Sequence, residues 1–302
     1  MTVGWFVVNA RDAVWILGAM KQHQPLPAPY GAGPTHHRVR LMGIVNVTPD
    51  SFSDGGRFLA PDRAIAHARG LAAGGADLLD IGGESTRPGA REVSAEEELA
   101  RVAPVLEGIR DVDAAISIDT SKAAVAVASL DAGAEIVNDV TALRHDPVLA
   151  GLCAERECTV VLMHMQGTPR TMQEDPTYDD VVDDVKAFLA ERIEFAVGEG
   201  IAEERIWVDP GIGFGKTVDH NLELLRRLAE LRELGRPIVV GSSRKRFIGE
   251  LTGREVDDRL GGTIASNVLA LRAGADVLRV HDVAETRQAL LVAGSILDAA
   301  TA

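Results

Sequence analysis

Short apolar runs alternate with longer amphipathic stretches along the chain from residue 40 to the C-terminus. The apolar runs have the length of buried strands, and the stretches between them repeat apolar positions with the spacing of a helix. The predicted strands are Leu41–Val47, Asp77–Ile81, Ala115–Asp119, Ala134–Asn138, Thr159–His164, Ile206–Asp209, Pro237–Gly241 and Asp276–Val280. The predicted helices are Asp62–Ala73, Ala95–Ile109, Lys122–Ala132, Pro147–Glu157, Asp179–Glu199, His220–Leu234, Asp257–Ala273 and Ala284–Leu297.

This order of elements predicts an α/β fold of the (β/α)₈ TIM-barrel class. The strand–helix units occupy about 260 residues, and ~250 residues is typical of such a barrel. A doubly wound open sheet is the structural alternative, but a full set of units without a charged or antiparallel edge strand favours closure. The first strand is not followed by a G-x-G-x-x-G turn, which excludes the dinucleotide-binding form of that alternative, and the sequence has no P-loop either.

Residues 1–39 are predicted to form an N-terminal extension, and residues 40–302 a single barrel domain. Val3–Val8 and Ala13–Leu17 are apolar runs joined by a polar turn, which is the pattern of a β-hairpin. Lys21–Arg38 is a linker rich in Pro, Gly and His. No apolar run reaches transmembrane length, and no basic segment precedes a signal-peptide core. We therefore expect a cytoplasmic protein with no membrane partner.

The composition is that of an ordinary globular protein with an acidic balance. Hydrophobic residues make up 46% of the chain, charged residues 25%, and the formal net charge is −14. We expect no nucleic-acid partner, because binding nucleic acid would require a broad basic surface. Any cluster of Arg and Lys should instead mark a local anion site. Cys153 and Cys158 form no C-x-x-C pair and are expected to be reduced thiols.

Polar side chains follow the carboxyl end of every predicted strand. In a TIM barrel these positions meet at one end and carry the chemistry. Any one of them could be a helix cap, but buried polar groups at strand after strand are costly without a function. The polar residues at these positions are Asn46, Asp50, Asp54, Asp80, Glu84, Ser85, Thr86, Arg87, Asp119, Asn138, Asp139, His164, Asp209, Lys216, Ser242, Ser243, Arg244, Lys245, Arg246, Arg279 and His281, and the apolar Met163 and Phe214 lie among them.

Two chemical groups can be recognised among these strand-end residues. The first combines carboxylates, an amide and an ammonium, which suits a flat heterocycle with ring N–H donors and carbonyl acceptors. Its members are Asp119, Asn138, Asp209 and Lys245. The second follows the last two strands, where TIM barrels usually bind phosphate. Its members are Ser242, Ser243, Arg244, Arg279 and His281. The sequence thus predicts a site for a phosphorylated or pyrophosphorylated heterocycle.

Eight motifs that contain these residues run in order along the chain. They are MGIVNVTPDSFSDGG, DIGGESTRPGA, SIDTSK, VNDV, LMHMQGTP, DPGIGFGK, GSSRKRFIG and RVHDV. Together they closely resemble the dihydropteroate synthase family, from roughly residue 40 to the C-terminus. The resemblance implies a (β/α)₈ pterin-binding catalytic domain, in agreement with the order of the predicted elements. It also implies Mg²⁺ as the cofactor and a homodimer.

The resemblance implies a reaction of folate biosynthesis. In this reaction 6-hydroxymethyl-7,8-dihydropterin pyrophosphate and 4-aminobenzoate condense to 7,8-dihydropteroate and pyrophosphate. Loss of the pyrophosphate would leave a cation on the pterin methylene, which Asp119 and Asp209 would stabilise. The aromatic amine would attack as a neutral nucleophile, so that no strong general base is required. This agrees with a site that has no Ser-His-Asp or Cys-His arrangement.

The family's functional residues can be carried over position by position as implied roles. The catalytic residues would be Asp119, Asp209 and Lys245. The pterin would be held by Asp119, Asn138, Met163, Asp209, Phe214 and Lys245. The pyrophosphate would be held by Asn46, Thr86, Arg87, Arg279 and His281, and the Mg²⁺ would lie near Asn46. Two mobile loops would close the 4-aminobenzoate pocket, whose residues would be Asp50, Asp54, Thr86, Arg87, Lys245 and Arg246.

Arg246 stands where some members of the family carry Ser, and its backbone N–H is expected to face the 4-aminobenzoate carboxylate. Two alternatives remain open. A methyltetrahydrofolate:corrinoid methyltransferase would share the pterin-holding Asp and Asn positions but would need no pyrophosphate cradle, so Arg279 and His281 favour the synthase. A non-catalytic pterin-binding paralogue is disfavoured by the intact set of Asn46, Asp119, Lys245 and His281.

Overall fold

The computed structural model describes residues 39–48, 59–86 and 89–299 of the 302-residue chain. The N-terminal hairpin and linker that the sequence predicts lie outside these residues, apart from Val39. Asp50, Asp54 and Arg87 lie outside them as well.

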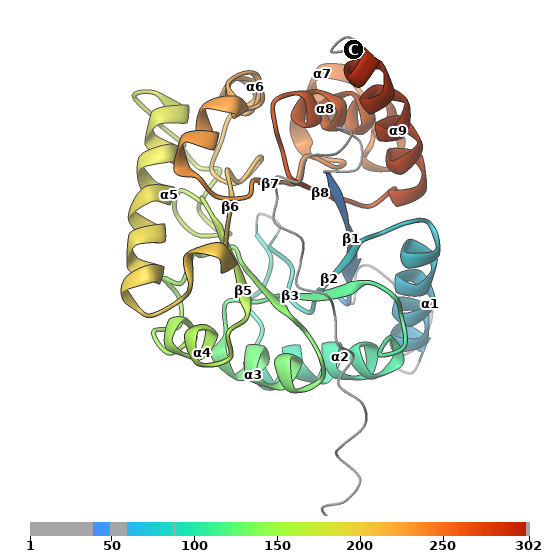
Figure 1. The fold of residues 1–302 in the computed structure, drawn as a ribbon, viewed down its shortest axis with the longest axis vertical. Coiled ribbons are helices and arrows are strands. Elements are labelled where there is room, and N and C mark those ends of the chain that lie inside the picture. The colour runs from blue at the N-terminus through green and yellow to red at the C-terminus, as the bar shows by residue number, and fades with distance from the viewer. Residues whose placement is uncertain (1–38, 49–58, 87–88, 300–302) are drawn as a thin grey trace, which may run out of the picture.

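Parallel strands form a barrel that is surrounded by helices (Figure 1). The strands are β1 Arg40–Asn46, β2 Leu78–Gly82, β3 Ala115–Asp119, β4 Ile136–Asp139, β5 Thr159–Met163, β6 Ile206–Asp209, β7 Val239–Val240 and β8 Val277–Val280. They pair in the order β6-β5-β4-β3-β2-β1-β8-β7. An isolated parallel bridge between Val208 and Ile238 joins the two ends of this order, and Val208 N donates to Pro237 O at 2.9 Å. The TIM-barrel prediction is confirmed.

The helices follow the predicted order with three local differences. The α-helices are α1 Leu59–Ala73, α2 Ala95–Gly108, α3 Ala123–Asp131, α4 Leu149–Glu155, α5 Val181–Gly198, α6 Val218–Arg226, α7 Arg246–Thr252, α8 Leu260–Arg272 and α9 Val283–Ala299. Short 3₁₀ helices are η4 Glu203–Arg205, η5 Leu228–Leu234 and η6 Val256–Asp258. The helix predicted over His220–Leu234 is therefore α6 followed by η5, and the helix predicted from Asp257 begins only at Leu260.

The break between α6 and η5 falls at Arg227, whose backbone leaves the α conformation. Its guanidinium instead pairs with Asp180 at the start of α5 and with Glu230. The prediction missed α7 because a helix of seven residues is too short to show a clear apolar period. Strand β7 is shorter than predicted, and Pro237 before it has no N–H to donate to a neighbouring strand.

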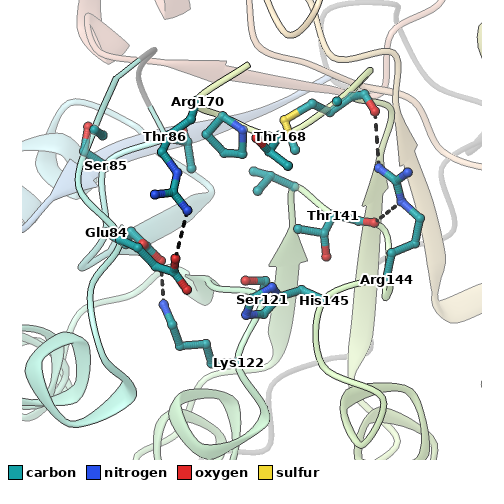
Figure 2. Close-up of a pocket in the computed structure, with 16 residues that line it drawn as sticks. Glu84, Ser85, Thr86, Ser121, Lys122, Thr141, Arg144, His145, Thr168 and Arg170 are labelled. Carbon is teal, nitrogen blue, oxygen red and sulfur yellow. Dashed lines mark hydrogen bonds and ion pairs between the residues drawn. The ribbon is translucent and has the colours of Figure 1, made fainter. Parts of the chain in front are cut away.

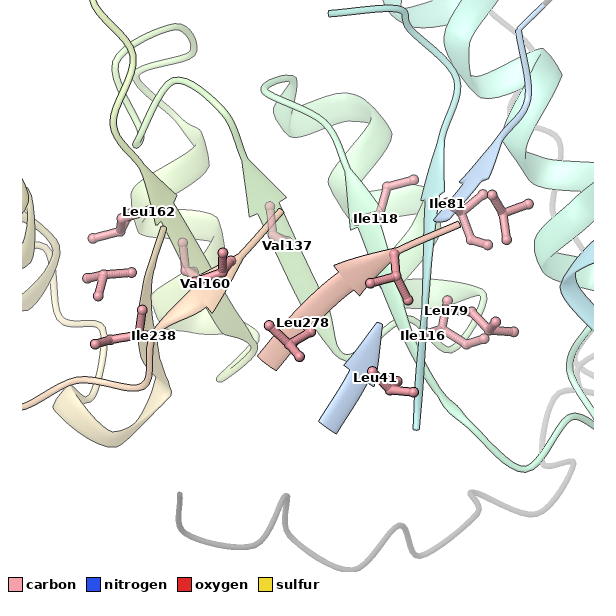
Figure 3. Close-up of a cluster of buried hydrophobic side chains, with 14 of the residues drawn as sticks. Leu41, Leu79, Ile81, Ile116, Ile118, Val137, Val160, Leu162, Ile238 and Leu278 are labelled. Carbon is pink, nitrogen blue, oxygen red and sulfur yellow. The ribbon is translucent and has the colours of Figure 1, made fainter. Parts of the chain in front are cut away.

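Alternate residues of the strands face two different environments. One set packs against the helices in a large core, and the strand residues of this set include Leu41, Leu79, Ile118, Leu162 and Leu278 (Figure 3). The other set points into the barrel and forms a smaller cluster, to which β3 contributes only the partly buried Ala115. The members of this inner apolar layer are Met42, Leu78, Ile136, Val161, Trp207, Val239 and Val277. Burial of one such large side chain stabilises the fold by about 1.5–3 kcal/mol.

Two residues further along β2, β3, β4, β6 and β8, the same inward face becomes polar. This inner polar layer contains Asp80, Ser117, Asn138, Asp209 and Arg279. The parallel register places Asp80 beside Ser117, and Asn138 beside Asp119. The strand pattern therefore delivers polar groups to the carboxyl end of the barrel, above an apolar floor.

Two further expectations can be compared with the structure. Cys153 and Cys158 are both buried and both free, as expected. Within the described part of the chain, none of the helices combines the length and the apolar character needed to cross a membrane.

Candidate active site

The centre of the inner polar layer is the carboxylate of Asp80, which is fully buried on β2. It accepts hydrogen bonds from Ser117 Oγ at 2.6 Å, from Asn138 Nδ2 at 3.0 Å and from Arg279 Nε at 2.6 Å. A buried carboxylate is stable only when such donors and a positive charge compensate it. Asp80 therefore fixes the side chains of β3, β4 and β8 relative to one another.

Arg279 lies between two carboxylates. Besides Asp80, it donates from Nη2 to Asp119 Oδ2 at 2.8 Å. Burial raises the pKa of Asp119 to about 7; the guanidinium of Arg279 opposes this rise, and the charge of Asp80 adds to it. Although burial favours the neutral form of Arg279, the two carboxylates outweigh it and raise the Arg279 pKa. The Asp119 carboxylate is thus a group whose charge can change near neutral pH.

The residues expected to hold the pterin gather above this layer. A cavity at the barrel mouth is lined by Thr86, Asp119, Asn138, Val140, Met163, Asp209, Gly211, Ile212, Phe214, Gly241 and Arg279. Lys245 completes the set, because its Nζ lies 4.1 Å from the centroid of the Phe214 ring. Residues at the ends of β3, β4, β5, β6 and β8, together with Gly241 directly after β7, therefore converge on one small volume that combines carboxylates, an amide and an aromatic face.

Asp209 and Lys245 are two further charged groups at this cavity. The Asp209 carboxylate accepts the backbone N–H of Gly211 at 2.7 Å, while its burial raises its pKa. Burial and the nearby Arg279 lower the pKa of Lys245 to about 8. Burial thus disfavours the charged form of both groups, and a ligand of opposite charge or with matching hydrogen bonds would favour it.

The loop that carries Phe214 rests on the segment between β5 and α5. A side chain at Gly211 would place its Cβ only 1.9 Å from His164 O, so this close approach requires glycine, which also has φ +67°. Side-chain donors satisfy three successive carbonyls of the loop: Gln173 at Gly213, Lys216 at Phe214 and Tyr178 at Gly215. The aromatic wall of the cavity is therefore held firmly.

Lys216 and His164 form a buried pair behind this wall, with Lys216 Nζ 2.8 Å from His164 Nδ1. Burial lowers the pKa of Lys216 to about 7. Burial and the charge of Lys216 also lower the pKa of His164 to about 2, so the imidazole is neutral and accepts the hydrogen bond. The pair supports the loop from outside the cavity.

The residues expected to bind pyrophosphate are only partly together. Ser243 Oγ accepts the backbone N–H of His281 and lies 3.0 Å from its Nδ1. The hydroxyl can thus donate to Nδ1, which leaves a proton on Nε2. Burial, together with Arg279 and Arg244, lowers the pKa of His281 to about 3, so the ring is neutral. Asn46 ends β1, where no described residue hydrogen-bonds its side-chain amide.

Arg244 of the predicted anion group and the nearby Arg246 are both engaged with acidic side chains. Arg244 pairs with Asp282 through two hydrogen bonds, at 3.1 and 2.6 Å. The side chain of Arg246 is 79% exposed and pairs with Glu250 one turn along α7. The guanidinium of Arg279 donates to the carboxylates of Asp80 and Asp119 rather than to His281. The positive charge expected for an anion is therefore present but largely compensated by acidic neighbours.

A second cavity of about 400 Å³ opens outside the first (Figure 2). The two share Thr86 and Val140 in their walls. Charged groups of the outer cavity meet as ion pairs, in which Lys122 contacts Glu84 and Arg170 contacts Glu92 (Figure 2). Thr86, which the sequence placed in a closing loop, thus lies at the boundary between the inner and the outer cavity.

Sequence reasoning did not assign roles to Asp80, Lys216, Lys122 or Glu98. Asp80 could have been recognised, because a carboxylate in the middle of the apolar run LLDIG must have a buried partner. Glu98 gave no comparable signal, since it belongs to an acidic helical turn that resembles a solvated surface.

Known proteins are similar to this chain over most of its length. Residues 42–281 match the family described as pterin binding enzyme. The chain belongs to this family. A dihydropteroate synthase of Escherichia coli strain K12 is 48% identical over 260 residues, which cover 86% of this chain and 92% of that protein. At this identity and coverage, the chain is placed among the dihydropteroate synthases of the family.

Solved structures of this family have the same fold. A dihydropteroate synthase of Xanthomonas albilineans with 4-aminobenzoic acid has a TM-score of 0.82 at 51% identity and covers 87% of this chain and 94% of its own. A structure from the same organism in complex with 7,8-dihydropteroate has a TM-score of 0.79 at 48% identity, and covers 87% of this chain and 95% of its own. These relatives are synthases, the interpretation that the motifs favoured over a corrinoid methyltransferase.

Proposed function

We propose that this protein condenses 6-hydroxymethyl-7,8-dihydropterin pyrophosphate with 4-aminobenzoate to form 7,8-dihydropteroate and pyrophosphate. The observation that carries the proposal is the convergence of Asp119, Asn138, Asp209 and Phe214 on one cavity, with Lys245 against the Phe214 ring. A pterin has a guanidine-like edge with paired N–H donors and a carbonyl, which these carboxylates, the amide and the ammonium complement. The ligands bound to the Xanthomonas structures are the second substrate and the product of this reaction.

Asp119 and Asp209 have the main electrostatic role in this mechanism. When the C–O bond to pyrophosphate breaks, positive charge develops on the pterin methylene and spreads into the ring. Two largely buried carboxylates that line the same cavity are preorganised to stabilise that charge, and their burial makes the effect large. Lys245 hydrogen-bonds the ring system from the Phe214 face. Met163 and Phe214 enclose the apolar surfaces of the ring.

The pyrophosphate leaves toward Arg279, His281 and Asn46. The Nε2–H of neutral His281 donates to a phosphate oxygen, and Arg279 exchanges part of its carboxylate pairing for the leaving group. Among the described residues no group of three or more His, Cys, Asp or Glu could hold a metal. Mg²⁺ fits this donor set only if the substrate supplies most of its ligands, as is usual for Mg²⁺ at phosphates, with Asn46 Oδ1 as a protein ligand. When bound, the ion would neutralise charge on the leaving group.

The second substrate attacks the cation through its neutral amine. Thr86 at the boundary of the two cavities and the start of α7 after Lys245 are the groups that we assign to orienting it, with Asp50, Asp54 and Arg87 in the adjoining loops. The backbone N–H of Arg246 faces the carboxylate of 4-aminobenzoate, so this position does not depend on the exposed guanidinium. Exclusion of water protects the cation until the amine reacts.

Exposed apolar side chains on α8 and α9 support a homodimer. These two helices pack side by side at one edge of the barrel (Figure 1). The exposed fractions are 57% for Leu269, 44% for Leu291, 59% for Val292 and 67% for Ile296. Such a patch is favourably buried against a second copy. Sedimentation of the purified chain tests this proposal, and a monomer at every concentration would contradict it.

The activity is tested with purified protein, Mg²⁺ and both substrates. Pyrophosphate and 7,8-dihydropteroate should appear in equal amounts, and omission of 4-aminobenzoate should suppress the product. A separate titration with the pterin substrate alone should show binding. Pterin binding without any pyrophosphate release would rule out the synthase and would favour a non-catalytic pterin-binding protein.

A further inference from the structure

Lys122 lies outside the pterin cavity, yet its ammonium joins three elements at the carboxyl end of the barrel. It is the N-cap residue of α3, three residues after Asp119. Its Nζ lies 2.5 Å from Glu84 Oε2, at the end of β2, and 2.6 Å from Glu98 Oε2, on α2. We refer to these three residues as the Lys122 cluster.

The cluster is buried and densely constrained. The side chain of Glu98 is fully buried, and that of Lys122 is 11% exposed. Glu98 Oε1 has no hydrogen-bond partner among the described residues, so Lys122 is the charge that compensates it. Helix α2 also presses against Gly83, where an added Cβ would lie 2.9 Å from Glu98 Cγ. Burial of an acidic side chain costs free energy even when it is paired, so the presence of Glu98 indicates a role beyond packing.

The cluster fastens both ends of the connection between β2 and α2. Glu84 uses its second oxygen, Oε1, to accept the backbone N–H of Val93 at 3.0 Å. The same carboxylate therefore binds Lys122 through one oxygen and, through the other, accepts the backbone N–H of a residue nine positions further along the chain. Thr86, at the boundary of the two cavities, lies two residues after Glu84. Movement of Glu84 would move Thr86 with it.

The cluster also acts on the catalytic carboxylate through space. Burial has the largest effect on the raised pKa of Asp119, and the negative charge of Glu98 is among the charges that raise it further. Lys122 offsets that charge, since its own ammonium is held protonated: the hydrogen bonds and charges of Glu84 and Glu98 outweigh its burial and raise its pKa. Loss of the ammonium would therefore affect both the position of the loop and the charge of the site.

We propose that Lys122, with Glu84 and Glu98, is a positioning residue that holds the β2–α2 connection so that Thr86 meets 4-aminobenzoate. This proposal rests on the synthase function proposed above. Its central consequence is a separation of the two substrates: the pterin contacts are formed by other residues, so loss of the cluster should affect the second substrate far more than the first.

The test compares Lys122→Met with Lys186→Met, a matched control whose ammonium pairs with Asp183 on α5 and with Glu233 on η5. Because a displacement of 1 Å can cost about 100-fold in rate, we expect kcat/KM for 4-aminobenzoate to fall ~10- to 100-fold in Lys122→Met. Affinity for the pterin substrate should change much less, because the variant can affect it only through the charge of Asp119. Lys122→Arg, which retains the charge and two donors toward the carboxylates, should recover much of the loss.

A second variant separates positioning from stability. In Lys122→Met/Glu98→Leu the buried ion pair is replaced by apolar groups, a change that often preserves or improves stability. Glu84 still lacks its partner in this variant, so the thermal midpoint should recover while kcat/KM for 4-aminobenzoate stays low. Recovery of both quantities together would overturn the proposal and leave the cluster a purely structural role.

Amide hydrogen exchange gives a readout that does not depend on activity. The Val93 amide should exchange faster in Lys122→Met and in the double variant, and should be unchanged in Lys186→Met. Unchanged exchange at Val93 would contradict the proposed link between Lys122 and the loop. A wild-type chain that releases no pyrophosphate would instead refute the proposed function, and the exchange experiment would still decide whether the cluster fastens the loop.

Discussion

The inner apolar layer and the inner polar layer lie on the same faces of the same strands, about 6.6 Å apart, the rise of two strand residues. The apolar layer consists of side chains that are at most 3% exposed and that fill volume. The polar layer is equally buried around Asp80, but its members are joined by directional hydrogen bonds and ion pairs. A void in the first layer lowers the stability of the fold, and a missing partner in the second leaves a buried polar group uncompensated.

In the barrel, stability and chemistry therefore depend on different layers. Apolar packing depends on shape, whereas the polar layer depends on which atom donates to which. A substitution in the apolar layer should therefore lower the stability of the whole fold and leave the chemistry of folded molecules intact. A substitution of similar size in the polar layer should impair the chemistry far more than it lowers the stability of the fold. Three experiments test this separation.

The largest effect is expected for Leu78→Ala in the apolar layer. Removing the side chain of a fully buried leucine leaves a cavity, and the free energy of unfolding should fall by about 2–5 kcal/mol. Urea unfolding measures this loss, and kcat per folded molecule should remain that of the wild type. Leu222→Ala, at a side chain that is 39% exposed, is the matched control and should be nearly neutral. A large fall in kcat for Leu78→Ala would show that the two layers are coupled.

The next effect concerns Asp119→Asn at the edge of the polar layer. The amide can still accept from Arg279, but it carries no charge to stabilise the pterin cation, so kcat should fall about 100- to 1000-fold. Stopped-flow measurement of pyrophosphate release gives this rate, and the urea midpoint should move less than in Leu78→Ala. Asp131→Asn, whose exposed carboxylate pairs with Arg156, is the control for loss of a charge. An unimpaired Asp119→Asn variant would remove Asp119 from the mechanism.

The smallest effect is the dependence of kcat/KM on pH. Asp119 has a raised pKa of about 7 and acts as the ionised carboxylate, so kcat/KM should rise as the pH increases toward and through 7. Lys245 has a lowered pKa of about 8 and acts as the ammonium, so kcat/KM should fall above 8. Lys245→Arg should have a lower maximum but no decline in this range, because arginine stays charged. A decline that persists in Lys245→Arg would assign the upper limb to another group.

Much of the fold could be predicted because it follows local rules. Each strand shows its apolar run, and polar residues mark where each run ends, so the barrel and most of the cavity residues were accessible from sequence. Asn138 and Asp209 were assigned to a heterocycle site in this way, and Phe214 to the pterin pocket through the family resemblance. The structure brings all three residues to the same cavity. The register of the parallel strands places residues from different motifs beside each other, and the sequence pattern does not contain this register.

The pairings within the site were not predictable, because they join residues far apart in the chain. Arg279 and Asp80 are separated by 199 positions, and Asn138 and Asp80 by 58. The sequence assigned Arg279 to an anion, whereas the structure gives it two carboxylate partners. Lys122 could be seen as part of the SIDTSK motif, but only the packing of α2 against Gly83 reveals the buried Glu98 that it serves. Charge compensation is a property of the folded chain.

The edge between β6 and β7 has a consequence for how the protein responds to its substrate. Adjacent strands elsewhere in the sheet share ladders, but this pair is joined by the isolated bridge at Val208 and Ile238. Asp209 ends one side of this edge, and Lys245 follows the other. A pterin that contacts both residues spans the edge, so that its binding free energy is added to the cohesion of the sheet. The backbone amides of β6 and β7 should consequently exchange more slowly when the pterin is bound, because the substrate stabilises the closure of the barrel at this edge.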